Sequence, residues 1–576
     1  MQLTTQPDIG LPPRRFLEEG FDPTNVEALK SKVQELLDRE ILTVKDLEQW
    51  TLDQSELSSQ VGAALARRYI AMTCDTKDEE AREAYLSFQK NVIPEFSVLS
   101  DKLNKHFLKS PFKKELGKRY EVFIREAEKE AEIFREENTK LAADDSALAA
   151  AYSQIQGKVT IEHGGKTLTA QQAGALLEEK DRGLREEVWR KIGDRRLEDV
   201  EEIEDLFDKM VALRTRMAKN AGFANFRDYI FEKKLRFDYG PADCEAFHEA
   251  VEQVVVPVLG TFAEERKTRL GLDTLRPWDT AVKLSGGEPS RPFKDQEGYI
   301  ELTKKIFQKV DPFFAQEFDK LVRNDMLDLM SREGKAPGGY QYVLEDIRLP
   351  FIFINAVGSQ RDLRVLLHEG GHAFHSLLCR DEPLVSYRHS PMEFAEVASM
   401  SMELLGFEQM DKVIDPGEAR ESFASFLKDA LATFSWVATI DAFQHWIYTN
   451  PEHSREERRA KWNEIRQRFG PHVDYSGIEK YQDYLWHRQG HIFGSPFYYI
   501  EYAIAQIGAF QVWLKEREDH EQAIKAYKDA LSLGGSRPLP ELFRTAGGRF
   551  AMDAEMLGTL VPEVTKKIEE LQAETA

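Results

Sequence analysis

Residues 366–378 read LLHEGGHAFHSLL, and this short stretch holds three of the thirteen histidines in a chain of 576 residues. His368 and His372 stand four residues apart, so on a helix both imidazoles lie on one face, at a spacing that can bind a single metal ion. Glu369 can reach a water molecule on that metal. This is the H-E-x-x-H arrangement, in which two histidines bind zinc and the glutamate is the general base. The alternative is a helix whose histidines only cap or pack.

The histidine cluster is expected on a helix that carries two unfavourable glycines. Ser359 and Asp362 form an S-x-x-D pair, which predicts the start of this helix. Gly370 and Gly371 each cost up to about 1 kcal/mol relative to alanine inside a helix. A bare backbone at these positions favours a close approach by another element or by a substrate.

A third metal ligand is needed, because catalytic zinc normally has three protein ligands and a water molecule. The metzincin pattern, H-E-x-x-H-x-x-G-x-x-H, fails because His375 and Leu378 occupy the positions of its glycine and third histidine. The next segment, SPMEFAEVASMSMELLGF at residues 390–407, offers a glutamate instead. Glu396 lies there among apolar residues, where a carboxylate is costly unless it is paired or bound to a metal. Glu396 is therefore the predicted third ligand.

The same segment is predicted to form one helix with two further glutamates. Ser390 and Glu393 suit a capping box at its start, and Gly406 suits its C-terminal stop. Glu403 stands seven residues after Glu396 and returns to nearly the same face. It is a candidate acceptor for a hydrogen bond from a ligand histidine. The alternative for Glu403 is an ordinary surface glutamate.

Most of the remaining sequence has helical periodicity, so the predicted fold class is mainly α. A β-hairpin is expected near residues 158–168, around Gly164 and Gly165. A second β candidate, GKAPGGYQYVLEDIRLPFIFINAV, comes directly before the histidine cluster and predicts a small sheet beside that helix. We divide the chain into an N-terminal helical region, 1–195, which includes the hairpin, and a catalytic region, 196–576.

Composition indicates which kinds of binding partner and which cellular compartment to expect for this protein. The net charge of −22 argues against nucleic acid or an anionic membrane surface as the main partner, because both require a basic face. Cys74, Cys244 and Cys379 lie far apart in the sequence, which is typical of a reducing compartment and not of a disulfide framework. The first residues show no signal-peptide pattern, and no run of eighteen apolar residues occurs. We expect a cytoplasmic protein, and the sequence gives no indication of its oligomeric state.

Several motifs together resemble the thimet oligopeptidase and oligoendopeptidase F family of zinc metallopeptidases. HEGGHAFHS, followed 28 residues after its first histidine by the glutamate of FAEVAS, carries the resemblance. RLGLDTLRPWD, HIFGSPFYYIEYAIA and GGSRPLPELFRTAG resemble the oligoendopeptidase F branch, from about residue 110 onward. The resemblance implies two helical lobes flanking a deep channel with the metal helix at its floor. It also implies one zinc ion per chain and short, unfolded peptides as substrates. His375 then lies in the channel or behind the ligands.

The segment GHIFGSPFYYIEY is the expected source of a donor to the oxyanion that forms in peptide hydrolysis. The resemblance implies that a histidine and tyrosines from such a segment contact the substrate carbonyl. His491 and Tyr498 are the predicted residues, with Tyr502 as a further candidate. Tyr499 is the neighbouring possibility, and ordinary helix packing is the alternative for all three tyrosines.

The predicted function is a zinc-dependent endopeptidase that acts on oligopeptides. An extended substrate is expected to add to the edge of the strand PFIFINAV, beside Gly338 and Gly339. A carboxypeptidase or dipeptidyl carboxypeptidase is the alternative, and it needs a cation for the substrate's C-terminal carboxylate. Arg380, Arg388 and Arg488 lie near the site in the sequence, and none is favoured. A non-catalytic peptide-binding protein is the other alternative, but such a protein has no need of Glu369.

Overall fold

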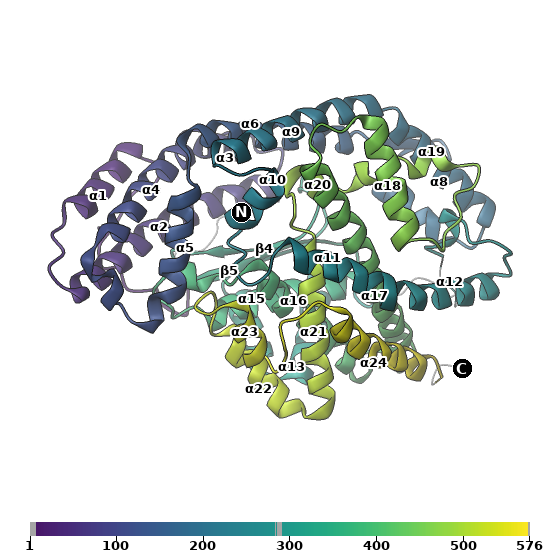
Figure 1. Cartoon of the computed structure of the whole chain (residues 1–576). Coiled ribbons are helices and arrows are strands. Elements are labelled where there is room, and N and C mark those ends of the chain that lie inside the picture. Colours follow the sequence, from purple (N-terminus) through teal and green to yellow (C-terminus); the bar gives the residue numbers. More distant parts are fainter. Residues whose placement is uncertain (1–6, 283, 285–290, 574–576) are drawn as a thin grey trace.

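A nearly all-helical chain is interrupted by two small sheets (Figure 1). The computed structural model describes residues 7–282, 284 and 291–573. The helices before the second sheet are α1 (Val26–Asp38), α2 (Val44–Cys74), α3 (Glu79–Asn91), α4 (Ile93–Lys109), α5 (Glu121–Ile133), α6 (Glu136–Gly157), α7 (Ala170–Ala175), α8 (Arg182–Leu197), α9 (Val200–Asn220), α10 (Phe226–Lys233), α11 (Pro241–Ala250), α12 (Val256–Leu270), α13 (Gln296–Val310) and α14 (Pro312–Arg323). Those after it are α15 (Gln360–Leu378), α16 (Met392–Gln409), α17 (Pro416–Thr449), α18 (Arg455–Phe469), α19 (Glu479–Gln482), α20 (Gly490–Gly494), α21 (Ile500–Glu518), α22 (His520–Leu531), α23 (Leu539–Thr545) and α24 (Ala554–Ala573). The predicted mainly α class is confirmed.

The helices form an upper arch and a lower group in the view of Figure 1. Helices α6 and α9 run along the top, and α1, α2, α4 and α5 stand at the left end. The second sheet and helices α15 and α16 lie below this arch, with α22 and α24 at the bottom. None of the helices in the described ranges has the length and apolar content needed to cross a lipid bilayer.

The N-terminal helices have a hydrophobic core of their own, separate from the main core. Leu36 on α1 and Trp50 on α2 are fully buried in it. Tyr387, which follows α15 in the sequence, also joins this N-terminal core. Its hydroxyl donates to the backbone carbonyl of Arg119 at 2.7 Å. The N-terminal helices are therefore anchored to the part of the chain that carries the histidine cluster.

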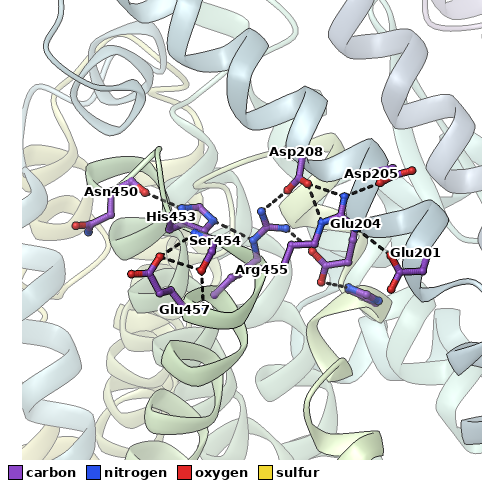
Figure 2. Close-up of polar contacts among 11 residues, drawn as sticks. Glu201, Glu204, Asp205, Asp208, Asn450, His453, Ser454, Arg455 and Glu457 are labelled. Carbon is purple, nitrogen blue, oxygen red and sulfur yellow. Dashed lines mark hydrogen bonds and ion pairs between the residues drawn. The ribbon is translucent and has the colours of Figure 1, made fainter.

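A row of four carboxylates joins α9 to the start of α18 (Figure 2). They belong to Glu201, Glu204, Asp205 and Asp208. Arg455 and Arg458 on α18 bind this row, and Arg458 is almost completely buried against Glu204. Glu204 also accepts a hydrogen bond from His487 at 3.1 Å. The network therefore ties the segment just before His491 to α9 and α18.

The strands form a two-stranded hairpin and a three-stranded mixed sheet. β1 (Thr160–His163) and β2 (Lys166–Thr169) are antiparallel and make the predicted hairpin. In the second sheet β5 (Leu349–Ala356) lies between β3 (Leu327–Met330), which is parallel to it, and β4 (Tyr340–Leu344), which is antiparallel. The prediction of a free edge on PFIFINAV is wrong, because this segment is the central strand β5. The outer strands are β3 and β4, and β4 is the one that begins next to Gly339.

Two glycines allow α15 and α16 to approach each other closely. An ideal Cβ at Gly371 on α15 would lie 2.6 Å from the carbonyl oxygen of Ala398 on α16. Gly406 on α16 has the reciprocal role, because its Cβ would lie 2.7 Å from Leu367. The prediction that Gly406 ends the helix is wrong, since α16 continues to Gln409. Gly370 faces the other way, toward the ring of Phe307.

We expect Gly371→Ala to lower the free energy of unfolding, although alanine is the better helix former. The added methyl group would meet backbone atoms of α16, and overpacking of this kind costs about 1–3 kcal/mol. Gly370→Ala is the comparison variant, because its Cβ would meet the side chain of Phe307 and no backbone atom of α16. Urea unfolding in the presence of a chelator measures both effects without a contribution from metal. Equal stability of Gly371→Ala and the unmodified chain would contradict this account of the helix contact.

Candidate active site

Helix α15 presents two histidines side by side. The N–H of Ser359 donates to the Asp362 carboxylate at 2.8 Å, so the predicted helix start is confirmed. The ring centroids of His368 and His372 are 4.9 Å apart, and the ring planes make an angle of 86°. Both side chains are partly exposed. The two imidazoles therefore share one accessible face of the helix.

Glu396 on α16 brings a carboxylate to these histidines. Its Oε2 lies 3.4 Å from Nε2 of His368 and 3.6 Å from Nε2 of His372. Burial alone would raise the pKa of Glu396, but the contacts with the two histidines hold it well below its usual range. Two imidazole nitrogens and one carboxylate oxygen, all within 4.8 Å of one another, are a donor set typical of a catalytic zinc site. The residues present therefore fit the metal that the sequence predicted.

A further layer of contacts orients the ligand candidates. Glu403 accepts a hydrogen bond from Nδ1 of His368 at 2.7 Å, which turns Nε2 toward Glu396 and confirms the predicted acceptor. Arg364 binds the other oxygen of Glu403. Ser399 donates to Glu396 Oε2 at 3.0 Å. The sequence analysis did not identify Arg364 and Ser399, although their spacings of four and three residues from the ligands on the same helices were available signals.

The structure corrects the expectation for Glu393 and decides between the two alternatives for His375. Glu393 does not cap α16, because the helix has Pro391 as its N-cap and Glu393 is buried, where it accepts from the Tyr239 hydroxyl at 2.6 Å. Of the two positions expected for His375, the structure supports the one behind the ligand candidates, because this side chain is buried against Phe394. Burial lowers the pKa of His375 to about 3, so this imidazole is neutral and packs behind the site.

Glu369 lies beside the start of strand β4. Its carboxylate oxygen Oε1 is 3.8 Å from the position that a Cβ on Gly339 would occupy. Burial raises the pKa of Glu369 above its ordinary value, and the positive charge of His368 and His372 opposes this shift. A carboxylate whose pKa is raised toward neutrality can take up and release a proton during a reaction. The predicted proximity of Gly339 to the site is confirmed.

An aromatic group closes the other side of the ligand cluster. The hydroxyl of Tyr498 donates to Glu396 Oε1 at 2.9 Å. The His491 ring stacks on Tyr498 with centroids 5.7 Å apart, and the Tyr502 ring lies 5.2 Å from Tyr498 at an angle of 71°. Gln489 donates to Nδ1 of His491 at 2.8 Å, so Nε2 carries the proton in the neutral ring. Burial lowers the pKa of His491, which favours this neutral form.

The predicted site residues therefore come together from three separate parts of the chain. They are His368, Glu369, His372, Glu396, His491, Tyr498 and Tyr502. Tyr499 also joins the group, with its ring centroid 5.0 Å from that of His491. A pocket of about 570 Å³ opens between α6 and α20, and His491 lines it.

Comparisons with known proteins identify the family to which the chain belongs. Residues 175–561 match peptidase family M3, and residues 16–134 match the peptidase M3 N-terminal domain. An oligoendopeptidase F homolog of Borreliella burgdorferi is 25% identical over 435 residues, which cover 71% of this chain and 70% of the relative.

Solved structures show the same fold over nearly the whole chain. PZ peptidase A, solved with an inhibitor, aligns with a TM-score of 0.89 and 28% identity over 96% of this chain and 99% of its own. Oligoendopeptidase-F from Enterococcus faecium aligns with a TM-score of 0.65 over 95% of this chain and 97% of its own, at 15% identity, which supports the fold alone. Together with the H-E-x-x-H helix and its glutamate ligand candidate, these matches show that the chain belongs to peptidase family M3 and is a metallopeptidase.

Proposed function

We propose that one zinc ion is held by His368, His372 and Glu396. The observation that carries this proposal is the approach of one Glu396 oxygen to the Nε2 atoms of both histidines. When bound, zinc polarises the substrate carbonyl and lowers the pKa of a water molecule. Glu403 fixes the tautomer of His368, so that its Nε2 is the unprotonated, ligating nitrogen.

Glu369 is the general base in this proposal. It follows the first ligand histidine directly, so its carboxylate lies next to the ligand cluster without belonging to it. It takes a proton from the attacking water and returns it to the leaving amine. The raised pKa that burial gives Glu369 suits both transfers.

Tyr498 and His491 are the donors to the oxygen on which negative charge develops. The phenol of Tyr498 already points at the ligand cluster, where it donates to Glu396. His491 stacks on that phenol and carries its proton on Nε2. Tyr502 packs edge-on against Tyr498 and supports its ring. Such donors act mainly on the transition state, because charge on the oxygen forms only there.

In this proposal the substrate backbone lies along the outer edge of β4, the edge that does not pair with β5. This strand begins at Tyr340, next to Gly339, whose bare backbone passes the Glu369 carboxylate. A peptide that pairs with β4 through main-chain hydrogen bonds would pass the general base. Recognition through the main chain gives loose sequence preference, which suits an enzyme that degrades mixed short peptides.

The enzyme is a metallo-oligopeptidase that cleaves internal bonds of short peptides. Two of the cations considered for a carboxypeptidase are already engaged elsewhere. Arg388 is buried and donates to Glu345 at 2.8 Å, and Arg380 donates to the Gly10 carbonyl at 2.6 Å. Neither is positioned to hold the C-terminal carboxylate of a substrate. The free, buried state of Cys74, Cys244 and Cys379 supports a cytoplasmic location.

We expect Glu369→Gln to retain zinc but to lower kcat by about 10²–10⁴-fold, the usual contribution of a positioned general base. Peptides of five to twenty residues with both ends blocked are the substrates, and mass spectrometry identifies the products. Internal cleavage by the unmodified enzyme and its loss in Glu369→Gln support the proposal. Glu333→Gln, at an exposed carboxylate, is the control. Products that appear only from peptides with free ends would instead indicate an exopeptidase.

Glu403→Gln should weaken zinc binding by about 10–100-fold, because the partner that orients His368 loses its charge. His368→Ala is the reference variant, in which the zinc of this site should be lost entirely. Metal content after gel filtration, followed by competition with a chelator, measures both effects. Unchanged metal content in His368→Ala would overturn the ligand assignment.

Tyr498→Phe should lower kcat by about 10²–10³-fold at saturating zinc, the range for removal of one oxyanion donor, with a smaller change in KM. Tyr502→Phe should have a smaller effect, because its ring packs against Tyr498. Steady-state kinetics on one blocked peptide compares these variants with Tyr499→Phe. If Tyr499→Phe lost most of its activity while Tyr498→Phe remained active, the donor role would belong to Tyr499.

A further inference from the structure

Tyr498 follows a residue whose backbone is strained. Phe497 has φ of 60°, in the left-handed region, and its side chain is fully buried. Residues other than glycine rarely adopt this conformation, and a residue held in it costs on the order of 1–3 kcal/mol. Such strain persists only where surrounding contacts enforce it. The contacts of Phe497 therefore decide how Tyr498 is placed.

Two buried side chains from distant segments bind both backbone polar groups of Phe497. Gln444, fully buried in α17, accepts from the Phe497 N–H through Oε1 at 2.9 Å. Arg236 donates to the Phe497 carbonyl, and the same guanidinium nitrogen lies 2.7 Å from Oε1 of Glu501. Arg236 is itself buried. The strained residue is thus held on both sides by polar groups that water cannot replace.

A second strained residue lies directly before Arg236 in the chain. This residue, Leu235, has φ of 57°. The preceding residue, Lys234, places its Nζ 5.1 Å from the centroid of the Tyr498 ring and 3.0 Å from Glu501 Oε1. Lys234 and Arg236 therefore share one carboxylate on the helix that follows Tyr498. Leu235 and Phe497, which both have positive φ, are therefore the chain neighbours of Lys234 and Tyr498, and the Lys234 side chain lies against the Tyr498 ring.

We propose that Gln444 and Arg236 are positioning residues that hold Phe497 in its strained conformation and so fix the Tyr498 phenol at the metal-ligand cluster. The inference rests on the proposed function, in which this phenol donates to the substrate oxygen. Relaxation of Phe497 to negative φ would redirect the chain and move the Tyr498 hydroxyl from its place 2.9 Å from Glu396. A hydrogen-bond donor that is already held in place does not have to move when negative charge develops on the substrate oxygen.

A purely structural role for these contacts makes a different prediction. The Phe497 ring packs against Phe231, His445 and Tyr448, so loss of the Gln444 contact would destabilise this region in either case. Destabilisation changes the amount of folded enzyme and leaves kcat per folded molecule unchanged. Positioning acts through the Tyr498 hydroxyl, so its effect on kcat must disappear when that hydroxyl is absent.

The test combines kinetics with a double-mutant cycle. Gln444→Met removes the acceptor with an unbranched side chain of similar length, and Gln444→Glu keeps an acceptor oxygen. We expect Gln444→Met to lower kcat by up to about 10²-fold, the cost of a misplacement of about 1 Å, with a smaller change in KM. Gln444→Glu should restore a large part of this loss. In the Tyr498→Phe background, Gln444→Met should lower kcat by less than about twofold.

Gln409→Met is the matched control, because Gln409 is a buried glutamine at the far end of α16. Its kcat should equal that of the unmodified enzyme. A crystal structure of Gln444→Met should show the Tyr498 hydroxyl beyond hydrogen-bond distance of Glu396. An unmoved Tyr498, or an undiminished loss of kcat in the Tyr498→Phe background, would overturn the inference.

The two readouts separate this inference from the proposed function. The crystal structure reports the position of Tyr498 without reference to activity. A fully active Tyr498→Phe enzyme would overturn the donor role, whereas a displaced Tyr498 in Gln444→Met would still support the positioning of Phe497. If Gln444→Met does not fold, Arg236→Lys removes the contact to the Phe497 carbonyl while it keeps a cation for Glu501, and the same readouts apply.

Discussion

The close contact between α15 and α16 is the constraint on which the site depends. At Gly371 the backbone of α15 touches that of α16, and a single methyl group would force the helices apart. On the opposite face of α16, Gly508 of α21 allows an equally close approach to Val397. Helix α16 is therefore held between two helices, and Glu396 is carried to within 3.4 Å of His368. Protein interiors are packed too densely for such a contact to shift without cost.

This contact also concentrates negative charge in a poorly solvated region. Glu369, Glu396 and Glu403 are all buried on two adjacent helices. Buried carboxylates are costly unless cations or hydrogen bonds compensate for lost hydration. Arg364 compensates Glu403. A divalent cation would compensate Glu396, and Glu369 keeps a raised pKa that suits proton transfer. The arrangement is thus unfavourable as ordinary packing and well suited to metal-dependent hydrolysis.

The aromatic side of the site depends on contacts of much longer range. His491, Tyr498 and Tyr502 lie more than a hundred residues after the end of α15. Their segment is fixed at one end by the carboxylate row of α9, through His487, and at the other by the contacts to Phe497. These supports come from helices on both sides of the site. The proposed donors are therefore held by tertiary contacts, as the proposed ligands are, although they follow a segment of short helical turns.

The sequence alone determined the features that follow from local spacing. Helical periodicity explains the i,i+4 histidines, the adjacent Glu369 and the return of Glu403 to the face of Glu396. The structure places these side chains as the pattern predicted. The Gly-Gly hairpin and the mainly α class were determined in the same way. Where helical periodicity fixes the relative direction of side chains, the sequence is sufficient to predict which of them lie together.

Only the tertiary structure decided the features that depend on distant partners. Glu393 satisfies a capping pattern, but Tyr239, 154 residues away, binds it in the core. PFIFINAV looks like an accessible strand, but β3 and β4 pair with it on either side, so that the outer edges of the sheet belong to these two strands. Gly406 resembles a helix stop, but it is a contact point for Leu367. The strain at Phe497 is likewise set by Gln444 and Arg236. Long-range packing and hydrogen bonds outweigh local preferences of about 1 kcal/mol, so no local pattern could have shown these outcomes.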